Sequence, residues 1–140
     1  MPAPIRLIIT YLATAIAFAA VDFIWLTQFG PKLYHPTLDP ILRPANDPVD
    51  LPAAVVFYLA YIVGVLALAV WPKRNEPLLQ TTITGAMLGA MCYATFDLTS
   101  QATFKVWSTQ ISLVDITWGI FITAFGATVG GFVLKKLTKA

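Results

Sequence analysis

The stretch ISLVDITWGIFITAFGATVGGFVL occupies residues 111–134 and contains a single charged side chain, that of Asp115. Its length is close to the 20 or so apolar residues that a helix needs to cross the hydrocarbon core of a bilayer. A helix satisfies all of its backbone hydrogen bonds within one segment, which lipid cannot do for it. The stretch therefore predicts a membrane-spanning helix.

Three further runs of the same character lie at residues 5–27, 52–71 and 78–100. The whole chain of 140 residues is 58% hydrophobic and only 11% charged, whereas soluble domains carry about 25% charged residues. A chain this small has no core that could bury so much apolar surface. We therefore expect an all-α membrane protein: a single domain over residues 1–140, with four transmembrane helices in an antiparallel bundle.

The basic residues predict the orientation of this bundle. With four spans, one side carries Arg6, Lys73, Arg74, Lys135, Lys136 and Lys139, and the other carries Lys32, Arg43 and Lys105. The positive-inside rule then places both termini in the cytoplasm of a bacterial cell, in a multi-pass protein of the inner membrane. The lipid bilayer is the expected partner. The net charge of +2 gives no argument for nucleic acid, and four short helices are compatible with a homodimer.

The first outer loop, residues 28–51, is rich in proline. Prolines recur every four residues, at Pro36, Pro40, Pro44, Pro48 and Pro52. This spacing predicts extended or turn structure rather than a continuous helix. A loop of this length is uncommon unless it is functional or disordered, so the sequence leaves open whether it is an ordered lid or a plain connector.

Three aspartates, Asp22, Asp97 and Asp115, lie inside the apolar runs without an obvious basic partner. A carboxylate at the centre of a membrane helix costs roughly 2.5–3.5 kcal/mol. Counted along their helices, all three lie roughly 5–8 Å below the outer surface. We therefore expect them to meet in one polar cavity beneath the outer face.

Aromatic and hydroxyl side chains accompany these acids. Asp22 and Trp25 have the same spacing as Asp115 and Trp118, so each pair shares one helix face. Each indole could donate its N–H to a carboxylate or a ligand, or lie at the interface as a belt residue. Tyrosines 58 and 61 could likewise bond a carboxylate or water. The candidate ligand-binding residues are Asp22, Asp97, Asp115, Trp25, Trp118, Tyr93, Tyr61 and Thr99.

Small residues recur every few positions on the last two spans. Gly85 and Gly89 lie on the face that carries Asp97, and Gly119, Gly126 and Gly130 follow Asp115. Such residues let two membrane helices approach closely. The pattern predicts tight packing of the third span against the fourth.

The composition excludes several kinds of chemistry. His35 is the single histidine, which rules out a bis-histidine haem within one chain, and no span contains a lysine that could anchor retinal. No nucleotide-binding fingerprint is present. Cys92 stands alone in an apolar segment, and we expect a buried, inert thiol. The remaining carboxylates and hydroxyls suit protons, an amine, or a hard divalent cation bound by Asp22, Asp97 and Asp115.

Three functions fit these features. The first is a binding or transport protein with an outward-facing acidic pocket for a cation, a proton or a small amine. The second is a membrane enzyme that acts on a lipid or other amphipathic substrate at the outer leaflet, for which no catalytic residue can be assigned. The third is a structural or accessory subunit, in which the aspartates only fix helix packing.

Several motifs resemble a known family. They are YATFDLTS at residues 93–100, LVDITWG at 113–119, DFIW at 22–25 and FYLAY at 57–61. Together they are similar to a family of small bacterial inner-membrane proteins known as domain of unknown function 2177. The resemblance covers nearly the whole chain and implies four membrane helices without an established activity. Phe96 and Ser100 depart from the tyrosine and asparagine usual at those positions, and the first loop is richer in proline.

Overall fold

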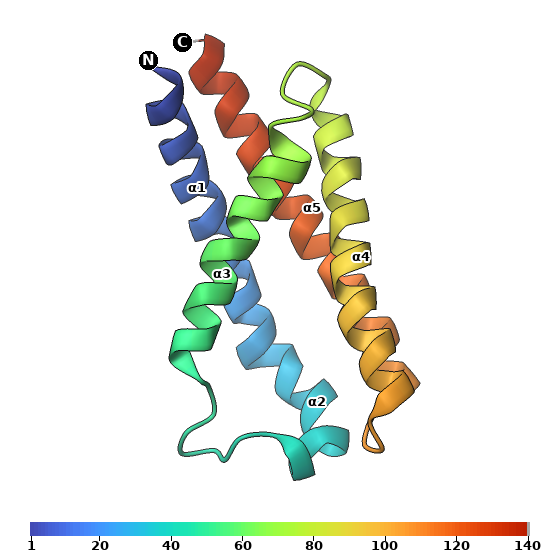
Figure 1. Cartoon of the computed structure of the whole chain (residues 1–140). Coiled ribbons are helices and arrows are strands. Elements are labelled where there is room, and N and C mark those ends of the chain that lie inside the picture. The colour runs from blue at the N-terminus through green and yellow to red at the C-terminus, as the bar shows by residue number, and fades with distance from the viewer. Residues whose placement is uncertain (140) are drawn as a thin grey trace.

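The computed structural model describes residues 1–139, and over that range the chain is helical, with no strand (Figure 1). Helix α1 (Ala3–Ile24) continues through a π-helical segment, η1 (Trp25–Phe29), into α2 (Gly30–Leu38) and a 3₁₀ turn, η2 (Asp39–Ile41). Helix α3 (Leu51–Val65) passes into a second π-helical segment, η3 (Leu66–Val70). Two long helices complete the chain, α4 (Leu78–Thr103) and α5 (Thr109–Lys139).

The predicted four-helix membrane architecture is confirmed. Each predicted span is a helix, and both termini lie at one end of the bundle while α2 lies at the other (Figure 1). Within the described chain, Ala3–Ile41, Leu51–Val70 and Thr109–Lys139 are long and apolar enough to cross a membrane. Helix α4 falls outside that group, because its buried face is built from small and polar residues, including Thr81, Gly85, Gly89, Asp97 and Ser100. The side of the membrane on which the termini lie stays a prediction.

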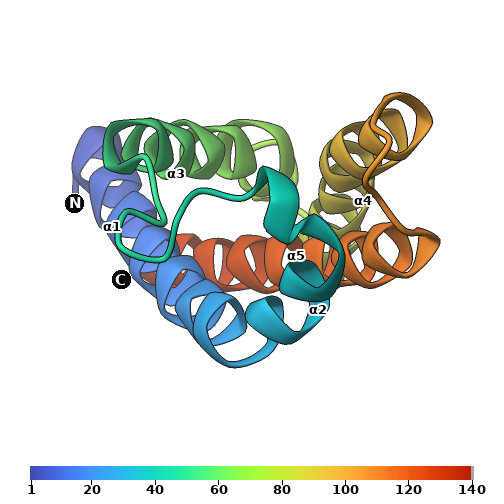
Figure 2. The ribbon, with the colours of Figure 1, turned by 90° about the horizontal axis from the view of Figure 1, so that it is seen from below.

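Helix α5 is the centre of the packing. It contacts both α4 and α1 along their lengths, and the view from below shows it between these two helices (Figure 2). Helix α3 lies against α1, and η3 contacts α4 and α5. Helix α3 itself makes little contact with α4. The two helices therefore meet near the end that carries the termini and diverge toward α2.

Glycines set the spacing of α4 and α5. A Cβ on Gly85 would lie 2.5 Å from Cβ of Ala127, and a Cβ on Gly89 would overlap the carbonyl oxygen of Gly119. These contacts confirm the predicted close approach of the last two spans.

Large apolar side chains cover the outside of the bundle rather than its core. Ile16 is 70% exposed and Met91 is 69% exposed. The buried core is small by comparison and centres on Phe18, Ile62 and Ile122, with a second cluster around Val65 and Leu134. Exposed apolar surface on this scale suits a molecule whose surroundings are lipid.

The prediction that proline keeps residues 28–51 out of a continuous helix was wrong for Gly30–Leu38, which forms α2. Pro31 is the second residue of α2 and directly follows the junction with the π-helical segment η1. Pro36 lies inside α2 but only two residues before its end. Residues 42–50 are turns and irregular chain, as the proline pattern predicts. Asp50 caps the N-terminus of α3, because its Oδ1 accepts a hydrogen bond from the backbone N–H of Ala53 at 3.2 Å.

Candidate functional site

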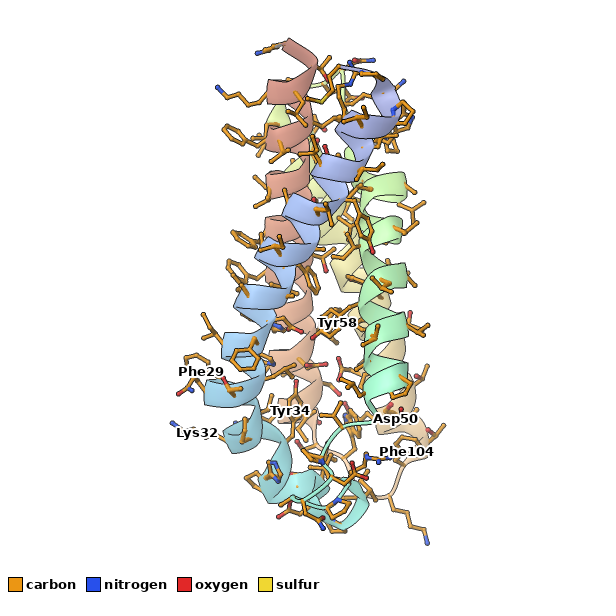
Figure 3. All side chains as sticks on the ribbon, turned by 90° about the vertical axis from the view of Figure 1, so that its left-hand side faces the viewer. Phe29, Lys32, Tyr34, Asp50, Tyr58 and Phe104 are labelled. Atoms are coloured by element: carbon orange, nitrogen blue, oxygen red, sulfur yellow. The ribbon has the colours of Figure 1, made fainter. Side chains whose placement is uncertain are left out.

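Asp22 links three helices. Its carboxylate is 6% exposed and accepts hydrogen bonds from the hydroxyl of Tyr58 in α3 and, at 3.0 Å, from the indole N–H of Trp118 in α5. Tyr58 points into the bundle from α3 (Figure 3). Each carboxylate oxygen thus has its own donor, an arrangement that fixes α1 against α3 and α5.

Asp115 receives its hydrogen bond from the segment that follows α1. The hydroxyl of Tyr34 in α2 donates to Oδ1 of Asp115, and the indole N–H of Trp25 donates to the Tyr34 hydroxyl oxygen at 3.4 Å. Tyr34 points toward the bundle, whereas its neighbour Lys32 points away from it (Figure 3). Helix α2 is therefore folded over the end of the bundle and held there through Asp115.

The two Asp-x-x-Trp motifs act across the contact between α1 and α5. Trp118 binds Asp22 of the opposite helix directly, and Trp25 reaches Asp115 through Tyr34. The two indole rings stack with centroids 4.6 Å apart and an interplanar angle of 8°. The spacing predicted that each acid and its tryptophan share a face, and the structure shows that each tryptophan serves the acid of the other helix.

Asp97 differs from the other two acids. Its side chain is fully buried, and within residues 1–139 neither of its carboxylate oxygens has a hydrogen-bond donor. Its carboxyl group neighbours that of Asp115 across the contact between α4 and α5. The two acids form a close pair in which only Asp115 has a donor from the protein.

A cavity of about 580 Å³ opens beside this pair, between α2, α3 and α4. Asp115 is the one acidic residue of the lining, and Tyr34, Tyr61 and Tyr93 are its hydroxyl-bearing residues. The rest of the lining is apolar, apart from the thiol of Cys92: Leu26, Leu38, Ile41, Leu42, Phe57, Phe96, Phe104 and Trp107. The cavity is thus a largely apolar chamber with one acidic spot.

The expectation that Asp22, Asp97 and Asp115 meet in one polar cavity does not hold. Asp115 lines the cavity, Asp97 is buried beside Asp115, and Asp22 is absent from the lining because Tyr58 and Trp118 enclose it. In the described chain no group of three or more His, Cys, Asp or Glu residues is placed to hold a metal ion. The arrangement gives no support to a metal site made of the three aspartates.

Of the other candidate residues predicted from the sequence, some line the cavity and some do not. Tyr61 and Tyr93 line the cavity, and the Tyr61 hydroxyl is also hydrogen-bonded to Oγ1 of Thr123 at 2.8 Å. Thr99 is exposed, and its hydroxyl donates to backbone carbonyls of its own helix, away from the cavity. Cys92 is exposed, which corrects the expectation of a buried thiol.

From the sequence alone, we did not identify the residues that close the cavity on the side of α2. Tyr34, Leu38, Ile41 and Leu42 all line it. Their spacing is that of one face of a helix, a signal that the prolines between them obscured.

Replacing Tyr34 with phenylalanine tests how α2 is held. The variant loses only the hydroxyl that donates to Asp115, and a hydrogen bond to a charged group contributes about 1.5–3 kcal/mol. We expect amide hydrogen exchange in residues 30–41 to become at least about tenfold faster, with α4 unchanged. Tyr11→Phe, which removes a hydroxyl bonded to the Leu59 carbonyl instead, is the control. Unaltered exchange in α2 would show that Asp115 does not hold it.

No curated protein and no solved structure matches the chain. A family model described as "Predicted membrane protein (DUF2177)" matches residues 7–132. The match covers most of α1 and α5, the whole of α3 and α4, and every residue of the cavity. The chain therefore belongs to the DUF2177 family of predicted membrane proteins.

Proposed function

We propose that this protein binds an amphipathic ligand at the α2 end of the bundle. The apolar part of the ligand occupies the chamber between α2, α3 and α4. Its head group binds Asp115 and is an amine, a hydroxyl or another group that can donate a proton. The observation that carries the proposal is the position of Asp115 in a largely apolar lining, next to the buried Asp97, whose carboxylate oxygens have no donor in the described chain.

The pair of acids explains why the head group should carry a proton or positive charge. Asp97 and Asp115 are both acceptors, and neither oxygen of Asp97 has a donor in the described chain, so a head group that brings a donor or a positive charge supplies what this pair lacks. An ammonium head group supplies positive charge and donors together, and a hydroxyl supplies one donor. A carboxylate or phosphate head group would be repelled.

The chamber favours a ligand with an apolar chain over a bare ion. Its lining is dominated by leucine, isoleucine, phenylalanine and tryptophan side chains. An ion would gain little from such walls, whereas a chain buries apolar surface at roughly 25 cal/mol per Å². The divergence of α3 from α4 leaves a side on which a chain from the surrounding lipid can enter.

An enzyme that acts on an amphipathic substrate is the second candidate, and the same chamber favours it. Asp97 and Asp115 would then exchange a proton with the substrate. The two functions differ in one observable: an enzyme returns a chemically altered molecule, which mass spectrometry of the released ligand detects, whereas a binding protein returns the molecule unchanged.

Cys92 provides a direct test, because it is the single cysteine of the chain, it is exposed and it lines the chamber. In detergent micelles, dodecylamine is expected to slow alkylation of Cys92 by a small uncharged maleimide, and dodecane is expected to do so more weakly. Asp115→Asn should raise the dodecylamine concentration for half-protection about tenfold or more, since a charge-assisted hydrogen bond is lost.

Asp22→Asn is the matched control, because it removes the same charge from a carboxylate outside the chamber. It should leave the protection unchanged. Equal protection by dodecylamine in the wild type and in Asp115→Asn, or protection that depends on Asp22 instead, would refute the proposal.

A further inference from the structure

The opposite end of the bundle, which carries both termini, holds a separate basic cavity of about 200 Å³. Its lining includes Arg6 from α1, Arg74 from the turn after η3, and Lys135 and Lys139 from the end of α5. Residues that are distant in sequence thus bring four cations to one small volume. This cluster plays no part in the chamber beside Asp115.

The cations of this cavity are positioned but not neutralised. Nζ of Lys135 donates to the backbone carbonyls of Arg74 at 3.1 Å and Glu76 at 2.5 Å. Arg74 donates to the Trp71 carbonyl at 2.7 Å, and its guanidinium lies 4.0 Å from the centroid of the Trp71 ring. The nearby carboxylate of Glu76 pairs with Lys73, at 3.4 Å.

Arg6 has an unmet hydrogen-bonding group. Its Nε is buried and has no acceptor within the described part of the chain. No side-chain carboxylate of residues 1–139 forms an ion pair with Arg6, Arg74, Lys135 or Lys139. A buried donor without an acceptor is destabilising, so an anion in this cavity would supply the acceptor that Arg6 lacks.

An apolar groove of about 530 Å³ adjoins the basic cavity. It runs between α1 and the α3–η3 helix, with Tyr11, Leu12, Val63 and Leu66 among its walls. Trp71 and Leu134 belong to the lining of both the groove and the basic cavity. The two spaces are therefore neighbours, with cations at the end of the bundle and an apolar groove between α1 and the α3–η3 helix.

We propose that this composite site binds an anionic phospholipid of the leaflet at the terminal end of the bundle. Its phosphate group lies against Arg6 and Arg74, and one acyl chain lies in the groove below Trp71. Basic pockets between membrane helices suit anionic head groups, and the guanidinium fork matches the geometry of phosphate oxygens. A free phosphate ion would satisfy the cations but leave the groove uncovered, whereas a phospholipid satisfies both.

Native mass spectrometry of the full chain, with defined lipids added in detergent, tests this proposal. We expect phosphatidylglycerol to be retained at least about tenfold more strongly than phosphatidylcholine, and the double substitution Arg6→Gln with Arg74→Gln to abolish most of that preference. Lys32→Gln removes a charge at the other end of the bundle and should have no effect. Equal retention of the two lipids, or a preference that survives the double substitution, would overturn the proposal.

A second variant separates the lipid from a phosphate ion. Val63→Trp fills the groove without changing any charge, and Val63 is already 55% exposed, so the substitution leaves the core intact. It should weaken phosphatidylglycerol retention, while inorganic phosphate at equal concentration should fail to displace the lipid from the wild type. Full displacement by phosphate, or retention unaffected by Val63→Trp, would contradict the lipid assignment. Asp115→Asn should leave all of these results unchanged, which keeps this site distinct from the chamber.

Discussion

Replacement of Gly89 by alanine is expected to force α4 away from α5 and to lower the free energy of unfolding by about 1–3 kcal/mol or more. The added Cβ would overlap the carbonyl oxygen of Gly119 and lie 2.8 Å from Cβ of Thr123. The first obstacle is backbone in the middle of a helix, so no side-chain rotation relieves it. The two helices must therefore move apart, and this movement weakens packing along the whole of their contact.

Unfolding in sodium dodecyl sulfate, followed by far-ultraviolet circular dichroism, measures this effect. Gly64→Ala is the matched control, because apart from its own turn of helix nothing lies within 4 Å of the position of its Cβ. Alanine is favoured over glycine in a helix by about 1 kcal/mol, so this control should be neutral or slightly stabilising. Similar losses for Gly89→Ala and Gly64→Ala would show that helix contact does not depend on Gly89.

The second large effect is expected for Asp22→Leu. This substitution removes the acceptor for two donors at once, the hydroxyl of Tyr58 and the indole N–H of Trp118. Each donor left unsatisfied away from water costs about 1–3 kcal/mol. We therefore expect a loss of about 2–6 kcal/mol in unfolding free energy, with a much smaller loss for Asp22→Asn, which keeps an acceptor oxygen.

A double-mutant cycle with Tyr58→Phe isolates the contribution of the tyrosine. Removing the stranded hydroxyl should recover about 1–3 kcal/mol in the Asp22→Leu background, whereas Tyr58→Phe alone should destabilise. If Asp22→Leu proved neutral or stabilising, the burial of the carboxylate would outweigh its hydrogen bonds, and Asp22 would not be a structural lock.

The positions of the helices could be predicted because lipid permits few alternatives. An apolar run of about 20 residues in a bilayer has to be a helix, and the structure places helices at all four runs. Helix α2 could not be found in this way. Its prolines are unfavourable locally, and tertiary contacts outweigh them: Tyr34 reaches Asp115 and Leu38 covers the chamber.

The site could be predicted only in part, for a related reason. Helical periodicity shows which face a residue occupies but not which neighbour that face meets. It placed Asp22 beside Trp25 and Asp115 beside Trp118, yet the crossed hydrogen bonds depend on the register between α1 and α5. Cys92 shows a second gap, since apolar surroundings in the sequence of a membrane protein indicate lipid contact as readily as burial.

The uninterrupted run of helix from Ala3 to Ile41 bears on how a ligand would reach the chamber. Its 39 residues would measure about 58 Å at 1.5 Å per residue, against roughly 30 Å of hydrocarbon. Part of it must tilt or emerge among the head groups, where α2 forms a roof over the chamber. A ligand of the proposed kind would then reach the chamber laterally, by diffusion within the leaflet, rather than from the aqueous phase. Under the same proposal, bilayer thickness would set how far α2 lies above the hydrocarbon and so how readily the chamber is occupied.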